Sequence, residues 1–85
     1  MNNLNWDEFA KNISDYVGID ADKITKDTDL YEDLCMDSLG IFSMGMFLNG
    51  IYKLEVPLSS VAVISKVGDM FNLLNEEGVP SNGWY

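Results

Sequence analysis

The sequence contains no histidine and no arginine, and its only cysteine is Cys35. Without histidine, neither imidazole acid–base chemistry nor a histidine-dependent triad is available. A single cysteine cannot form an internal disulfide, and with no histidine and no second cysteine a zinc site is excluded. These absences remove several of the commonest catalytic and metal-binding classes.

Positive charge is also scarce in this chain. Five lysines stand against 14 aspartates and glutamates, which gives a formal net charge of −9 at pH 7. Nucleic acids and anionic membranes are bound through basic patches. We therefore expect no nucleic-acid partner, and the charge favours basic protein partners instead.

Long hydrophobic runs are absent as well. The sequence has no stretch of about 18 apolar residues, which a membrane-spanning helix would need. The first residues, MNNLNWDEF, lack the basic start and the apolar stretch of a signal peptide. We therefore expect a cytoplasmic protein without stable membrane insertion.

What the chain does have is enough apolar material for one small core, because 47% of its 85 residues are hydrophobic. We predict a helical domain over residues 1–77 and a flexible tail over residues 78–85, where turn residues follow one another without a period. In that tail, Trp84 and Tyr85 are the side chains able to fold back on the body.

The first helix is predicted from Asn5, which is followed three residues later by Glu8 as in a capping box, and it should end before Gly18. Its apolar residues at helical spacing are Trp6, Phe9, Ile13, Tyr16 and Val17. Residues 19–37 show no period and indicate a long loop. We expect Ile24, Leu30 and Leu34 to anchor this loop to the core.

Three further helices complete an all-α four-helix bundle. The second should run from about Ser38 to Lys53 with Asp37 as its N-cap, and its core-facing stripe comprises Ile41, Met44, Leu48, Ile51 and Tyr52. A short third helix over 58–63 follows Pro57, with a strand over 61–64 as the alternative. Ser65 should cap the fourth helix, which carries Val67, Met70, Phe71 and Leu74. The predicted core contains Trp6, Phe9, Ile13, Leu34, Met44, Leu48, Val56, Ile64, Val67 and Phe71.

Ser38 occupies the first turn of the second helix, where unpaired backbone N–H groups and the helix dipole favour a phosphate. Serine is also common at helix starts for capping reasons alone. The surrounding string DLYEDLCMDSL, from Asp29 to Leu39, together with the long preceding loop and the downstream Pro57, resembles the acyl carrier protein family. The resemblance extends over roughly residues 6–76.

This resemblance implies a carrier rather than an enzyme. In the family, a phosphopantetheinyl transferase moves 4′-phosphopantetheine from coenzyme A onto the serine that matches Ser38. Asp37 and Leu39 are, by resemblance, the flanking residues that the transferase recognises. The arm then carries an acyl group as a thioester between acyl-loading and acyl-accepting enzymes. We expect a freestanding, monomeric carrier of a specialised polyketide or fatty-acid-type pathway.

The second helix also offers a partner surface. At 100° per residue, Leu39, Phe42, Met46 and Lys53 lie opposite the core-facing stripe, which predicts an exposed apolar docking surface. The chain departs from the family here, because no acid occurs from Ser38 to Leu54. Acids gather before the serine instead, at Asp20, Asp22, Asp27, Asp29, Glu32, Asp33 and Asp37. We expect docking through apolar contact and through the charge of the loop.

Two other functions remain compatible with the sequence. One is an aminoacyl or D-alanyl carrier, although an aspartate before the serine favours acyl over peptidyl carriers, in which a glycine is more usual there. The other is an unmodified helical adaptor that binds a partner through Leu39, Phe42 and Met46.

Overall fold

The computed structural model describes residues 3–80 and confirms the four-helix bundle with a long loop between its first two helices. The helices are α1 (Trp6–Val17), α2 (Ser38–Tyr52), α3 (Leu58–Val61) and α4 (Val67–Glu77). The loop contains one 3-10 turn, η1 (Ala21–Lys23). Two short strands, β1 (Leu54–Glu55) and β2 (Val79–Pro80), complete the fold.

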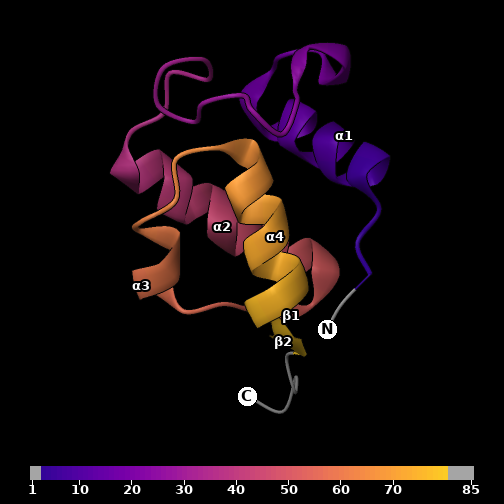
Figure 1. Ribbon diagram of the computed structural model, residues 1–85, viewed down its shortest axis with the longest axis vertical. Coiled ribbons are helices and arrows are strands. Elements are labelled where there is room, and N and C mark those ends of the chain that lie inside the picture. The colour runs from indigo at the N-terminus through magenta and orange to yellow at the C-terminus, as the bar shows by residue number, and fades with distance from the viewer. Residues whose placement is uncertain (1–2, 81–85) are drawn as a thin grey trace.

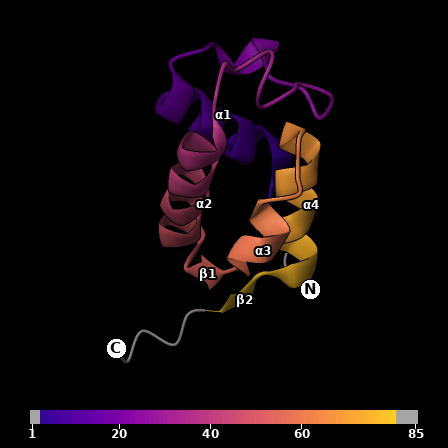
Figure 2. The ribbon, with the colours of Figure 1, turned by 90° about the vertical axis from the view of Figure 1, so that its left-hand side faces the viewer.

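The long loop and the strand pair lie at opposite ends of the bundle (Figures 1 and 2). Helix α2 runs from the loop end to the strand end, and α3 lies between the lower parts of α2 and α4 in Figure 2. None of the helices within residues 3–80 is long and apolar enough to cross a membrane.

Helix α1 begins after its N-cap Asn5 and ends before Gly18, as predicted. The side-chain oxygen of Asn5 accepts a hydrogen bond from the Glu8 N–H at 2.9 Å, and Gly18 ends the helix in the left-handed region with φ 78°. Phe9 and Ile13 are fully buried, as predicted. Tyr16, however, is exposed, and its ring centroid lies 5.0 Å from that of Phe47 of α2, which is also exposed.

Helix α4 begins differently from the prediction, because its N-cap is Lys66 and not Ser65. The Asp69 carboxylate accepts hydrogen bonds from the backbone N–H groups of both residues, at 3.2 Å from Lys66 and 3.4 Å from Ser65. The next two amides, of Val67 and Gly68, donate to loop carbonyls. The helix start is therefore satisfied by the loop and by Asp69 rather than by a serine side chain.

Three backbone hydrogen bonds tie the loop to the start of α4 and to Ser65 just before it. Val67 N–H donates to the Thr28 carbonyl at 2.9 Å, Gly68 N–H donates to the Lys26 carbonyl at 3.0 Å, and Leu30 N–H donates to the Ser65 carbonyl at 2.8 Å. The predicted anchors Ile24, Leu30 and Leu34 are all buried. The loop is thus an ordered layer over one end of the bundle.

The core matches the prediction closely. Eight of the ten expected residues are buried, namely Phe9, Ile13, Leu34, Met44, Leu48, Val56, Val67 and Phe71. The other two, Trp6 and Ile64, are partly buried and pack against this cluster. Trp6 meets Phe71 edge to face, with ring centroids 5.2 Å apart.

The strand pair was not predicted. Strands β1 and β2 are antiparallel, with Leu54 opposite Pro80 and Glu55 opposite Val79. The alternative strand over 61–64 does not form, because Val61 ends α3 and turns follow it. Strand β2 begins the segment predicted as a flexible tail, of which residues 81–85, with Trp84 and Tyr85, lie outside the described residues.

Candidate functional site

Ser38 is the first residue of α2 and is exposed to solvent. Asp37 precedes it in an extended conformation and caps the helix, since its Oδ1 accepts a hydrogen bond from the Gly40 N–H at 2.7 Å. The predicted helix start is therefore confirmed. The capping hydrogen bond therefore orders the backbone of the first helical turn, which carries the Ser38 side chain.

Two amides at this helix start have no acceptor. Asp37 takes up the Gly40 N–H through its side chain and the Ile41 N–H through its carbonyl, the latter at 2.9 Å. Within residues 3–80, this leaves the N–H groups of Ser38 and Leu39 without a hydrogen-bond partner. A phosphate joined to the Ser38 oxygen would meet these donors and the positive end of the helix dipole.

A turn centred on Asp29 builds the segment before the serine. Its Oδ1 accepts hydrogen bonds from the Tyr31 N–H at 2.8 Å and the Glu32 N–H at 2.9 Å. The hydrogen bond from the Glu32 N–H, together with the Tyr31 N–H and the positive charge of Lys66, outweighs desolvation and holds the pKa of the Asp29 carboxyl below its usual value. The turn is then closed by Asp33, whose Oδ2 accepts from the Asp29 N–H at 2.8 Å.

The segment before Ser38 carries three exposed acids: Glu32 and Asp33 in this turn, and Asp37 directly before the serine. Their negative charge repels a free anion approaching the helix start. The site therefore suits a phosphate that is attached covalently better than one recruited from solution.

A small depression includes Ser38 in its lining. It has a volume of about 30 Å³ and is lined by Tyr31, Ser38, Ile41, Phe42, Val61 and Ala62. The lining comes from the loop, α2 and α3, so the depression marks where α3 packs beside the start of α2. Sequence reasoning missed Tyr31, Val61 and Ala62, because no local signal in a sequence places α3 against Ser38.

The outward surface of α2 agrees only in part with the prediction. Leu39 and Met46 are 74% and 65% exposed. Phe42 was expected to be exposed with them, but it is partly buried. The reason is its position on the flank of α2 that faces α3, where it lines the depression with Val61.

The C-terminal end of α2 carries a second correction. Ile51 was assigned to the core-facing stripe, yet it is 40% exposed. Tyr52, which was assigned to the same stripe, does face inward: it is partly buried, and its ring stacks on Phe9 with a centroid distance of 6.3 Å. Lys53 ends the helix in the left-handed region with φ 55° and is exposed.

The exposed surface of α2 thus carries large apolar side chains and no acid. Acidic loop residues lie at its Ser38 end, and Lys53 lies at its other end. A scan against protein-family models finds no match for this chain. The resemblance to acyl carrier proteins therefore depends on the residues of the chain itself.

Proposed function

We propose that the protein is an acyl carrier that holds acyl intermediates as thioesters on a 4′-phosphopantetheine arm attached to Ser38. The observation that carries this proposal is an exposed serine on the first turn of α2, inside the Asp-Ser-Leu segment, beside two amides without acceptors. The arm supplies the thiol, and the cargo is an acyl group of a specialised polyketide or fatty-acid-type pathway.

In the attachment step, the Ser38 oxygen forms a new bond to the pantetheine-bearing phosphorus of the coenzyme A diphosphate, the P–O bond that links this phosphorus to the other phosphate breaks, and adenosine 3′,5′-bisphosphate leaves. The hydroxyl proton passes to a base of the transferase, since the described residues place no basic side chain within hydrogen-bond distance of Ser38. Asp37 and Leu39 flank the serine in exposed positions where a transferase can contact them.

The pathway enzymes would dock on α2 through Leu39, Phe42, Met46 and Lys53. Leu39 and Met46 supply exposed apolar contact, and Phe42 supports it from its partly buried position. Because the helix itself has no acid, its contribution to binding should depend little on salt concentration. The acidic loop contributes the salt-dependent part.

Intact mass spectrometry after incubation with coenzyme A and a promiscuous phosphopantetheinyl transferase tests the proposal. We expect the wild-type chain to gain one phosphopantetheine and Ser38→Ala to gain none. Ser43→Ala is the matched control, because Ser43 is an exposed serine of the same helix. A gain of mass in Ser38→Ala, or an unchanged wild-type mass with several transferases, would refute the carrier function.

The exposure of Leu39 and Met46 also favours a second candidate function, an unmodified adaptor that binds a partner through this surface. Such an adaptor would bind its partner equally well with Ser38 and with Ser38→Ala. Aminoacyl and D-alanyl groups are the alternative cargo for a carrier. Loading assays on the phosphopantetheinylated chain distinguish these cargoes.

A further inference from the structure

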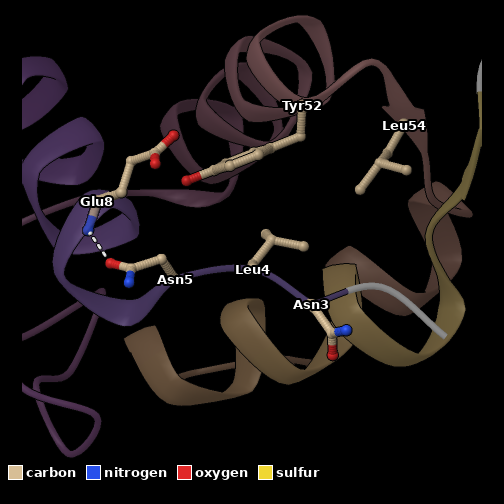
Figure 3. A pocket seen from close by; sticks show the side chains of 6 residues that line it. All are labelled: Asn3, Leu4, Asn5, Glu8, Tyr52 and Leu54. Atoms are coloured by element: carbon tan, nitrogen blue, oxygen red, sulfur yellow. Dashed lines mark hydrogen bonds between the residues drawn. The ribbon is translucent and has the colours of Figure 1, made fainter.

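Helix α2 has an inner face that the chain itself covers and an outer face that it leaves open. On the inner side, Figure 3 shows the Tyr52 side chain extending from α2 towards Glu8 of α1. The buried residues of the same side include Ile41, Met44 and Leu48. In Figure 2, α2 forms one side of the bundle, and no other element within residues 3–80 lies outside it. The outer face is therefore open to a partner.

One line of exposed residues runs along this outer face. Leu39, Met46 and Lys53 are seven residues apart, so each is turned only about 20° from the one before it. Helix α2 itself has no charged side chain, whereas its N-cap is Asp37 and its C-cap is Lys53. The line thus reads from an acid, through two apolar side chains, to a base.

This line is complementary to itself when it is reversed. In an antiparallel pair with a two-fold axis at Met46, each end of one α2 lies beside the opposite end of the other. Leu39 of one copy is then level with Lys53 of the second copy. The lysine stem can cover the leucine while its ammonium approaches Asp37. Because the axis exchanges the two copies, the same contact forms at both ends of the pair.

The surface next to Met46 permits a close approach of two helices. The exposed residues on either side of it, Ser43 and Gly50, are small, and a Cβ atom at Gly50 would meet no atom within 4 Å. Packed helices lie about 8–10 Å apart, and their Cα atoms lie about 2.3 Å from each axis. The two Met46 Cα atoms would therefore be about 5 Å apart.

We propose that two copies of this chain associate through α2 as an antiparallel dimer with its two-fold axis at Met46. One face of a 15-residue helix is smaller than the about 800 Å² per partner of a standard interface, so the dimer is weak. The net charge of −9 on each copy opposes association, and salt should strengthen it. At low concentration the chain remains the monomer expected from the sequence. The dimer does not depend on the carrier function, because it needs no group on Ser38.

Sedimentation equilibrium of the unmodified full chain, from micromolar to millimolar concentration, tests the association. We expect the weight-average mass to rise towards twice that of one chain. Met46→Lys places two positive charges at the axis and should keep the chain monomeric over this range. Val63→Lys is the matched control, because Val63 is an exposed apolar residue outside α2, and it should associate like the wild type. A wild type that stays monomeric, or a Met46→Lys variant that associates equally well, would overturn the proposal.

A double-mutant cycle in the same assay tests the charge pair. Lys53→Gln and Asp37→Asn should each weaken association several-fold, and asparagine keeps the helix cap. The two changes together should weaken it no more than either one alone. Independent, additive effects would refute the pairing of these two side chains.

Disulfide cross-linking tests the antiparallel arrangement. With Cys35→Ser as the background and diamide as the oxidant, Met46→Cys should form a linked dimer, since about 5 Å between Cα atoms suits a disulfide. Leu39→Cys should not, because its two copies lie about 20 Å apart in this pair. Cross-linking of both variants would indicate a parallel pair, and cross-linking of neither would exclude contact at Met46. Either result would overturn the proposal and leave the phosphopantetheine test at Ser38 unaffected.

Discussion

Replacing Gly68 by alanine tests whether the loop is packed directly on α4. A Cβ atom at this position would lie 2.8 Å from the Lys26 carbonyl oxygen and 2.9 Å from the Lys26 Cβ. Neither atom can move away easily, because the Gly68 N–H donates to that same carbonyl at 3.0 Å. The neighbouring bond from Val67 N–H to the Thr28 carbonyl holds the loop on the other side. The substitution therefore forces the loop and the helix apart.

The expected size of the effect follows from three contributions. Overpacking of this kind costs about 1–3 kcal/mol, and weakening the Gly68 hydrogen bond costs about 1 kcal/mol. Alanine returns at most about 1 kcal/mol through its higher helix propensity. We expect Gly68→Ala to lower the free energy of unfolding by about 2 kcal/mol and the melting temperature by roughly 10 °C.

Urea unfolding followed by far-UV circular dichroism measures this change, and Gly50→Ala is the matched control. A Cβ atom at Gly50 would meet no atom within 4 Å. We expect this exposed helical substitution to stabilise the chain by about 0.5–1 kcal/mol, so the two alanines should act in opposite directions. Equal stability of the two variants would refute the close approach of the loop to α4.

Three further outcomes follow from the site and its loop. Asp37→Ala should lower the free energy of unfolding by about 1 kcal/mol through loss of the helix cap, whereas Asp37→Asn should keep most of it in the same urea assay. Asp29 has a lowered pKa, because backbone N–H groups bind its carboxylate in the folded chain. Its stabilising effect should be complete above the unfolded pKa of about 3.9 and lost as the pH falls through the lower folded value; acid titration should show a smaller loss for Asp29→Asn. Leu39→Ala and Met46→Ala should each weaken partner binding by about 1 kcal/mol or more and leave the urea midpoint unchanged. Phe42→Ala should weaken binding and also lower the urea midpoint, because its side chain is partly buried. Isothermal titration measures the binding, and urea unfolding measures the midpoint.

The helix starts at Asn5 and Asp37 could be predicted because each depends on a side chain and an amide three residues apart. The start of α4 could not, since its amides are bound by carbonyls of Lys26 and Thr28, far away in the sequence. Serine is a common N-cap residue, but the backbone N–H groups that Ser65 would bind donate to the loop carbonyls and to the Asp69 carboxylate instead. Local signals thus predicted local hydrogen bonds and failed for distant ones.

The candidate site shows the same division. Ser38 and its cap follow from adjacent residues, and the structure confirms their geometry. The angular positions of Leu39 and Met46 placed them correctly on the exposed side of α2. Phe42 lies on a flank, where burial depends on whether another element packs there. The sequence does not show that α3 does so, and the depression beside Ser38 was therefore missed.

The backbone bonds from the loop to α4 have a consequence for how the proposed attachment site at Ser38 forms. The loop that leads to Ser38 can make these bonds only after α4, which is synthesised later, has docked against Lys26 and Thr28. Closing this contact carries an entropy cost that local helix formation does not. A nascent chain would therefore display the Asp-Ser-Leu sequence long before it displays the site. Enzymes that recognise the folded turn would then act only on finished molecules.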